Sequence, residues 1–378
     1  MALAACERPA RARDASTVAD AGGPFPTDAG RSATGFAAPP PGQVRADAAV
    51  PRLRDLAPFP WGTEVESRPL ATAPVYAELA RTQWSQLSIG FEAKMEVVVR
   101  PDGSFDFAPA DAIAAFAAAN GVRLMGAAVI WHEQRPQAFA RLKSDPVAFG
   151  RLYDAYITQL LSRYRGQARG WDVVNEPVDV EGGALRDSLW SEVLGQDGYM
   201  LRAFQVARAA DPDGVLFLNE GGQEIRPRKL DRLLRLTERL LKLGAPIGGL
   251  GAQLHVNVDI APGEIGRCLK AMAGFGLPVH VSEFDCSLQS DRRVDLRSRA
   301  DKVRAQERIY AEAVEAFDAL PARQRFAFTV FGQRDEDSWL RQPPNAGDGT
   351  DAPLLFDDAG RPKPVFWTTA QALRRLPR

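Results

Sequence analysis

The chain has 378 residues, of which 47 are Lys or Arg and 48 are Asp or Glu, so its formal net charge is −1. This balance excludes the basic surface that nucleic-acid binding normally requires. Hydrophobic residues make up 45% and charged residues 25%, which is typical of a globular protein. No apolar run approaches the ~18–20 residues needed to cross a bilayer. The three cysteines, Cys6, Cys268 and Cys286, are too few for a disulfide framework and lack metal-site spacing.

The first 54 residues differ in composition from the rest of the chain. Ala, Pro, Gly, Arg and Asp dominate them, and neither a helical nor a strand period is present. Such a segment buries too little apolar surface to offset its loss of conformational entropy, so we expect residues 1–54 to be a disordered tail or linker. A single globular domain is then expected over residues 55–378.

Residues 3–6 read Leu-Ala-Ala-Cys and resemble a bacterial lipobox, in which the cysteine is lipidated after cleavage of the signal. The basic and apolar regions of a secretory signal do not precede Cys6. Two interpretations stay open. If the true start lies upstream, the protein is exported and is periplasmic or a membrane-anchored lipoprotein. Otherwise the match is a coincidence and the location is unknown.

From residue 56 onward, short apolar runs alternate with longer amphipathic stretches, which favours strands alternating with helices. Several of the amphipathic stretches begin at Pro or Asp-Pro and end at Gly, as helices often do. The predicted strands are residues 59–65, 87–91, 122–131, 170–176, 215–220, 250–256, 279–285 and 326–332. The predicted helices are residues 74–83, 110–119, 146–164, 199–210, 228–243, 262–275, 297–319 and 365–376.

Strands alternating with helices over about 320 residues predict an α/β fold, the (β/α)8 or TIM barrel. The main alternative is a doubly wound open sheet, which normally carries a Gly-rich phosphate loop after its first strand. The Gly-rich run at residues 248–251 precedes a predicted strand instead of opening a helix. The barrel is therefore the fold that we expect.

Polar residues gather at the carboxyl ends of successive predicted strands. In a barrel these ends form the reactive face. Each cluster alone has a structural interpretation, since a turn often follows a strand and a single histidine is usually a satisfied structural group. Together they predict a cleft lined by carboxylates, amides and imidazoles. The clusters are residues 131–134 (WHEQ), 175–177 (NEP), 219–220 (NE), 253–255 (QLH) and 282–285 (SEFD).

Two carboxylates at this face follow hydrophobic strand residues: Glu176 after the fourth predicted strand and Glu283 in the seventh. Glycoside hydrolysis needs such a pair, because one carboxyl protonates the leaving oxygen while the other attacks the anomeric carbon. The Gly-x-Ser-x-Gly motif of a serine nucleophile does not occur, and no Cys/His cluster has zinc-ligand spacing. The sequence therefore favours glycoside hydrolysis, with no cofactor and no metal.

The segments around these glutamates resemble glycoside hydrolase family 10, the endo-β-1,4-xylanase family. Residues 171–177 (WDVVNEP) are similar to the family's acid/base segment, and residues 281–285 (VSEFD) are similar to its nucleophile segment. The resemblance runs in one collinear order from about residue 56 to the C-terminus. The other similar segments are residues 129–136 (VIWHEQRP), 251–255 (GAQLH), 329–340, 353–357 and 362–364.

The resemblance implies a retaining mechanism in which Glu176 is the general acid/base and Glu283 is the nucleophile. The acid must have a raised pKa while the nucleophile stays ionised, so we expect the surroundings of the two carboxyls to differ. Asn175 would bind the 2-hydroxyl of the sugar in the −1 subsite, a contact that strengthens in the transition state.

The resemblance also implies roles for five further residues. Gln253 and His255 would orient the nucleophile, and Asp285 would fix the tautomer of His255. His132 would contact the −1 sugar, and Trp339 would stack on its apolar face.

The chain departs from the family after its second predicted strand. Family 10 xylanases carry Glu-Asn-x-Met-Lys-Trp there, whose amide and ammonium hold the −2 sugar, whereas residues 92–97 here read Glu-Ala-Lys-Met-Glu-Val. With the methionines aligned, Glu92 is kept, Ala93 replaces the asparagine and Glu96 replaces the lysine. A shifted alignment would instead place Lys94 at the lysine position.

Two later positions differ as well. The tryptophan of strand eight is replaced by Phe331, which has no indole N–H to donate, and the aspartate after the strand-five asparagine is Glu220. We expect Glu92 and Phe331 to contact substrate. A subsite that has lost its hydrogen-bonding groups predicts weak or no activity on ordinary xylan, and preference for another or a decorated β-linked polysaccharide.

Two alternatives stay open. One is a carbohydrate-binding barrel that has lost catalysis, which the altered −2 region favours and the presence of both glutamates and their neighbours opposes. The other is a hydrolase that processes the cell's own exopolysaccharide. In each case we expect a monomer with a polysaccharide or oligosaccharide partner, no nucleic acid and no transmembrane segment. We also expect residues 333–363, which are too long for an ordinary connection, to form one wall of the cleft.

Overall fold

The computed structural model describes residues 50–343 and 345–377. Residues 1–49 of the predicted tail, with the lipobox-like Cys6, lie outside this part of the chain. The packed region begins close to the expected boundary, because Leu53 is already buried in the first helix, α1 (Leu53–Leu56). No helix among the described residues is both long and apolar enough to span a membrane.

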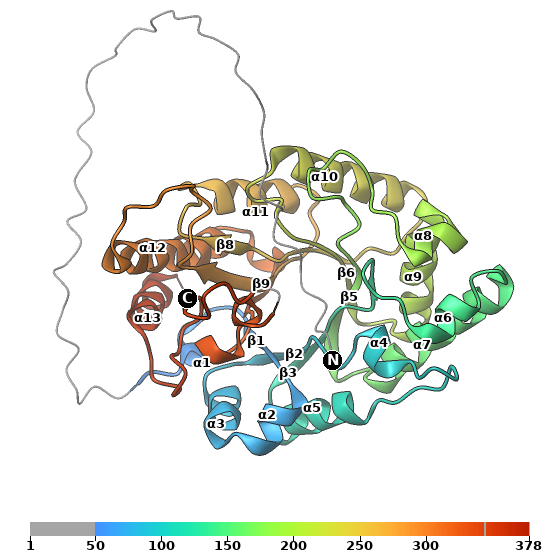
Figure 1. Cartoon of the computed structure of the whole chain (residues 1–378), viewed down its shortest axis with the longest axis horizontal. Coiled ribbons are helices and arrows are strands. Elements are labelled where there is room, and N and C mark those ends of the chain that lie inside the picture. The colour runs from blue at the N-terminus through green and yellow to red at the C-terminus, as the bar shows by residue number, and fades with distance from the viewer. Residues whose placement is uncertain (1–49, 344, 378) are drawn as a thin grey trace, which may run out of the picture. The chain divides into compact units, whose positions relative to one another are not determined.

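The main strands form one closed parallel barrel (Figure 1). In order around the barrel they are β1 (Trp61–Val65), β2 (Gln86–Ile89), β3 (Arg123–Gly126), β5 (Ala168–Asn175), β6 (Val215–Glu220), β7 (Gly249–Ala252), β9 (Val279–Ser287) and β10 (Arg325–Val330). β10 pairs with both β9 and β1, so the barrel sheet closes on itself. The predicted (β/α)8 barrel is confirmed.

Helices follow the strands and surround the barrel (Figure 1). Each predicted helix is present, and a proline lies in the first turn of several of them, as the sequence signals predict. The long helices are α3 (Pro74–Thr82), α5 (Ala108–Ala119), α7 (Pro146–Arg163), α9 (Gln196–Ala210), α10 (Pro227–Lys242), α11 (Glu264–Ala273), α12 (Arg299–Asp318) and α13 (Pro364–Arg375). Shorter ones, which the sequence analysis did not predict, are α2 (Ser67–Thr72), α4 (Met95–Val98), α6 (Gln137–Arg141), α8 (Leu189–Leu194), η1 (Ala322–Gln324), η2 (Asp335–Asp337) and η3 (Trp339–Arg341).

Two of the predicted strands are each divided in the structure. Residues 122–131 form β3 and then β4 (Ile130–Trp131), which pairs with β5. Residues 250–256 form β7 and then β8 (His255–Asn257), which pairs with β9. Between β7 and β8, Leu254 has a φ of 60°, which is outside the extended region. A continuous apolar run does not reveal such a turn, so the prediction of unbroken strands was wrong.

The strands alternate between an apolar outer face and a polar interior. On the outer face, Trp61 of β1 stacks on Phe328 of β10, with ring centroids 5.1 Å apart. In the interior, the hydroxyl of Thr329 contacts His280 at 2.8 Å and Gln86 at 3.5 Å. Because side chains alternate along a strand, the same alternation decides which residues of β1, β2 and β10 face the barrel mouth.

A buried ion pair joins the barrel rim to α10. Glu220 ends β6, and its Oε1 lies 2.9 Å from Nζ of Lys229, with both side chains at most 5% exposed. Its Oε2 accepts a hydrogen bond from the backbone N–H of Val178 at 3.0 Å. Burial raises the pKa of Glu220, and the Lys229 ammonium opposes that shift. The pair therefore ties the loop after β5 to a helix of the outer layer.

Replacing Lys229 with methionine leaves Glu220 buried without its cation. We expect Lys229→Met to lower the free energy of unfolding by about 3–5 kcal/mol, measured by chemical denaturation at pH 7. The matched control is Lys242→Met on the same helix, where an exposed ion pair with Glu238 contributes less than about 0.5 kcal/mol. Equal losses for the two variants would contradict the assignment of Lys229 to a buried pair.

Candidate active site

The two predicted glutamates lie on one rim of the barrel. Glu176 directly follows β5, Glu283 lies near the end of β9, and their side chains are 8% and 12% exposed. Asn219 of β6 connects their surroundings, because its Nδ2 donates to Glu283 Oε1 at 2.9 Å and to Asn175 Oδ1 at 2.8 Å. Since Asn175 in turn donates to Glu176 Oε1 at 3.3 Å, one chain of amides runs between the carboxyls.

Hydrogen-bond donors surround the carboxyl of Glu176. His132 Nε2 lies 3.2 Å from Oε2, and Gln253 Nε2 donates to Oε1 at 2.9 Å. Burial alone would raise the pKa of Glu176, but the hydrogen bonds and charge of His132, together with Gln253, lower it below its ordinary value. Its backbone φ of 52° is uncommon for a residue with a side chain, and such conformations concentrate at functional sites.

These contacts correct one expectation from the sequence. Gln253 was expected to orient the nucleophile Glu283, but in the structure it donates to Glu176 and to Asn175. In the ligand-free site, the hydrogen-bond donors of Glu176 lower its pKa, so a raised pKa in the substrate complex stays a prediction. The partner of Gln253 was missed because a motif names residues at strand ends but does not show which neighbours their side chains reach.

Glu283 lies beside a buried histidine that contacts two carboxyls. His255 Nε2 lies 3.3 Å from Glu283 Oε2, and Nδ1 lies 2.9 Å from Asp285 Oδ2. Burial would lower the pKa of His255, but Asp285 and Glu283 hold it well above its ordinary value. The Asp285 contact fixes the orientation of the ring, and its selection of one tautomer stays a prediction.

Two aromatic rings enclose this histidine. Phe331, just after β10, packs edge-on against His255 with centroids 5.1 Å apart. Trp339, in η3, lies 4.9 Å from the same ring, and its Nε1 donates to Asp285 Oδ2 at 2.8 Å. Residues 333–363 thus bring a ring to the cleft. Stacking of either ring on a sugar stays a prediction.

The loop after β2 holds both residues that could align with the family's lysine. Glu96 is exposed and accepts a hydrogen bond from the backbone N–H of Arg135 at 2.7 Å. Lys94 places its Nζ over the ring of Trp131, 5.0 Å from the centroid, next to His132. Lys94 is therefore the cation nearer to His132, and the choice between the two alignments stays a prediction.

Glu92 occupies a more interior position than the sequence predicts. It is 4% exposed, and its Oε1 accepts a hydrogen bond from the backbone N–H of Ser67 at the start of α2. This contact fixes the loop between β1 and α2. Direct contact of Glu92 with substrate stays a prediction.

With this geometry in place, the chain can be compared with known proteins. Residues 54–372 match the family described as Glycosyl hydrolase family 10. The chain belongs to glycosyl hydrolase family 10. Family 10 membership agrees with the resemblance carried by the two glutamate segments.

The relatives of this family 10 chain include two proteins of Paenibacillus barcinonensis. It is 31% identical to endo-1,4-beta-xylanase C over 331 residues, which are 82% of this chain and 30% of that protein. It is 31% identical to endo-1,4-beta-xylanase B over 319 residues, which are 82% of this chain and 94% of that protein. The chain spans 27–30% of the length of the first curated relatives that it matches.

Solved structures show the same barrel. The GH10 structure from Paenibacillus barcinonensis matches with a TM-score of 0.79 and 29% identity, covering 87% of this chain and 99% of that one. A thermostable mutant of the xylanase Xyn10A from Cellvibrio japonicus matches with a TM-score of 0.75 and 30% identity, covering 85% and 99%.

Sequence reasoning missed two members of this family 10 site. Asn219 was noted at a strand end without a role, and in the structure it contacts both Asn175 and Glu283. Ser282 was noted only as part of its cluster, and its hydroxyl donates to Asn219 Oδ1 at 2.8 Å, which fixes the amide orientation. The signal that could have found them is their position one residue before a rim carboxylate.

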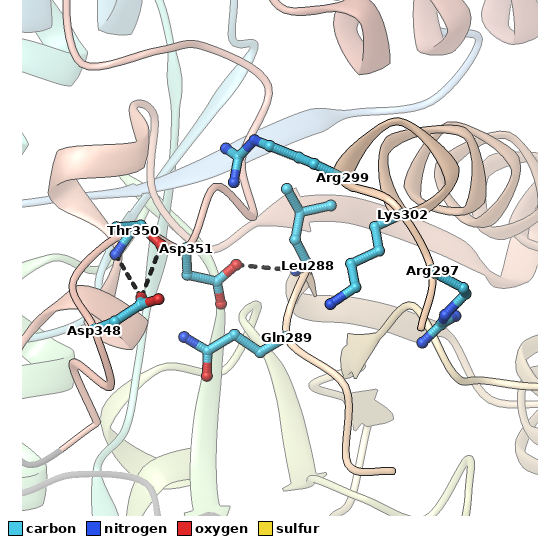
Figure 2. A pocket seen from close by; sticks show the side chains of 8 residues that line it. All are labelled: Leu288, Gln289, Arg297, Arg299, Lys302, Asp348, Thr350 and Asp351. Carbon is cyan, nitrogen blue, oxygen red and sulfur yellow. Dashed lines mark hydrogen bonds between the residues drawn. The ribbon is translucent and has the colours of Figure 1, made fainter. Parts of the chain in front are cut away.

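A second pocket lies beyond the end of β9 and is lined by neither Glu176 nor Glu283 (Figure 2). Two of its three cations, Arg297 and Lys302, are already paired with Asp295 at 2.8 Å and 2.9 Å. We therefore assign it no role in the site. Its lining residues are Leu288, Gln289, Arg297, Arg299, Lys302, Asp348, Thr350 and Asp351.

The His132 contact is expected to control the titration of Glu176. His132→Ala removes a donor that favours the carboxylate, so the pKa of Glu176 should rise by about one unit. Titration of 13C-labelled glutamate carboxyls measures it, with Glu176→Gln assigning the signal. The control His280→Gln alters a buried histidine that contacts Thr329 and should leave the midpoint unchanged. A midpoint that stays or falls in His132→Ala would refute the assignment.

Proposed function

We propose that this chain is a retaining glycoside hydrolase that cleaves within β-linked polysaccharide, with Glu176 as general acid/base and Glu283 as nucleophile. The observation that carries the proposal is the amide chain through Asn219 and Asn175, which brings two carboxyls with different surroundings together on one rim. Relatives that are described as endo-1,4-beta-xylanases support the same reaction class.

In the first step, a carboxylate oxygen of Glu283 attacks the anomeric carbon while Glu176 gives its proton to the leaving glycosidic oxygen. The bond from the anomeric carbon to that oxygen breaks, and a covalent glycosyl-enzyme forms. In the second step, Glu176 takes a proton from water, the water attacks the same carbon, and Glu283 is released as carboxylate. His255 Nε2, 3.3 Å from Glu283 Oε2, would orient the nucleophile through both steps.

The acid role requires a protonated Glu176 in the substrate complex, whereas the free site favours its carboxylate. His132 and Gln253 are the donors that lower its pKa, and each can also donate to a sugar hydroxyl. A bound sugar that takes over these donors would remove their effect on Glu176, and the remaining burial would then raise its pKa. Substrate binding would thus prepare the acid.

The lowered pKa of Glu176 in the free site also favours the second candidate, a carbohydrate-binding barrel without catalysis. A site whose acid is ionised in the free state can bind sugar through its amides and rings without transferring a proton. Against this candidate, the ring of His255 and the Asn219 amide are both directed at Glu283, a group that binding alone does not require.

Variants of Glu283 separate the two candidates. Glu283→Ala should lower kcat on 4-nitrophenyl β-xylobioside or β-cellobioside by at least about 10³-fold while oligosaccharide binding is kept, because the nucleophile is lost and the cleft remains. The control Glu238→Ala removes an exposed carboxyl on α10, outside the site, and should leave kcat unchanged. Unmodified protein that binds oligosaccharide but releases no nitrophenol would favour the binding barrel.

The substrate is proposed to differ from plain xylan. Ala93 and Glu96 stand where the family has an amide and a cation, and Lys94 supplies a cation from another position in the loop. Phe331 replaces the family's tryptophan and lacks its indole N–H donor. These changes favour another or a decorated β-linked polysaccharide, of which the cell's own exopolysaccharide is one candidate.

A panel of plant and bacterial polysaccharides tests this substrate class. We expect reducing ends to be released from unsubstituted xylan at least about tenfold more slowly than from the preferred member of the panel, because hydrogen-bonding groups of the glycone site have been lost. Fast turnover of unsubstituted xylo-oligosaccharides would contradict it.

A further inference from the structure

Glu64, at the end of β1, faces the barrel mouth although the mechanism does not use it. Gly62, two residues earlier, lies against Gln86 and Thr329 in the barrel interior, and side chains two apart on a strand share a face. Thr63 pairs with Val330, so the next residues along these strands are Glu64 and Phe331. Glu64 therefore lies on the same side of the mouth as the ring that packs on His255.

A glycine makes room for this carboxyl. The side chain of Glu64 lies over Gly90, just after β2, where a Cβ would overlap with its Oε1, Cδ and Cγ atoms. The backbone of Gly90 is outside the left-handed region, so its turn geometry does not require glycine. The absence of a side chain at Gly90 thus serves the placement of Glu64.

Polar atoms in this part of the mouth have no protein partner. Among the described residues, no donor is hydrogen-bonded to the carboxyl of Glu64, which is partly exposed. Ser88, which pairs with Glu64 in the β1–β2 register, is 5% exposed, and its buried Oγ also has no partner in the described part of the chain. An unpartnered hydroxyl on the strand position paired with an unpartnered carboxyl indicates a place for a polar ligand.

The electrostatic surroundings suit a sugar hydroxyl. Burial raises the pKa of Glu64 to about 8; the Lys94 ammonium opposes the shift, and the carboxyls of Glu66, Glu283 and Glu92 add to it. Near neutral pH the protonated carboxyl can both donate and accept a hydrogen bond, as a sugar hydroxyl does.

We propose that Glu64 is a specificity-determining residue, whose carboxyl, held over Gly90, hydrogen-bonds a hydroxyl of the sugar bound beside Glu283. The inference rests on the proposed function. It adds a group that would bind a sugar hydroxyl where the family's −2 subsite has lost its own hydrogen-bonding groups. Ser88 occupies the strand position paired with Glu64, and Lys94 borders this contact from the β2 loop.

Two glycosides, 4-nitrophenyl β-xylobioside and β-cellobioside, serve as probes of turnover, and xylotetraose and cellotetraose serve as probes of binding by calorimetry in a Glu283→Ala background. Glu64→Ala should lower kcat/KM and tetraose affinity by about 10- to 100-fold for the preferred sugar and change the ratio between the two sugars. Glu64→Gln, which still donates and accepts, should lose less. The matched control Glu66→Ala removes an exposed carboxyl two residues later and should change both by less than about twofold.

Gly90→Ala provides an independent test that leaves the carboxyl in the chain. Its added methyl displaces Glu64 and should reproduce the loss seen in Glu64→Ala, and the double variant should be no worse than either single variant. If Glu64→Ala fails to fold, Gly90→Ala alone still tests the proposal.

Three results would overturn the inference. The losses of Glu64→Ala and Gly90→Ala could be additive, or Glu66→Ala could have an effect equal to that of Glu64→Ala. The melting temperature of Glu64→Ala could also fall while its sugar affinities and their ratio stay within twofold. Failure of the proposed function is a different result, because wild-type protein would then cleave neither glycoside while tetraose binding still measures the effect of Glu64.

Discussion

The amide of Asn219 is the contact on which the rest of the site depends. One nitrogen donates to Glu283 and to Asn175, and Ser282 fixes the amide by donating to its oxygen. Asn175 continues the chain to Glu176. Asn175 ends the neighbouring strand β5, whereas Glu283 and Ser282 lie on β9, on the far side of β7. The side chain of Asn219 reaches past β7 because Gly251 has no side chain to block it. Because the barrel is closed, the positions of its strand ends determine where the two carboxyls lie relative to each other.

Each carboxyl then obtains its own electrostatic surroundings from a different part of the rim. His132 and Gln253 reach Glu176, whereas a histidine held by Asp285 and flanked by aromatic rings reaches Glu283. In the free state the contacts of Glu176 lower its pKa. In the proposed mechanism, the raised pKa that an acid needs comes from a bound sugar that competes for these donors.

The sequence predicted the fold and most of the rim, because strand and helix periods, proline starts and polar strand ends are all local signals. It did not predict the partner of Gln253, the titration of Glu176 or the role of Asn219, because these depend on which side chains meet across separate strands. Glu64 was hidden for a related reason. It belongs to a predicted strand, but its inward direction follows from the pairing of β1 with β2 and β10, and its place follows from the missing side chain at Gly90.

The order of the chain has a consequence for biosynthesis. β10, which closes the barrel, and Trp339, which holds Asp285, both come from the last part of the sequence, whereas Glu176 is made near its middle. A nascent chain that has emerged only as far as β9 carries both carboxyls but lacks the strand and the ring that complete their surroundings. Translation must therefore continue past Trp339 before both glutamates have these surroundings, and shorter nascent chains hold exposed strand edges until then.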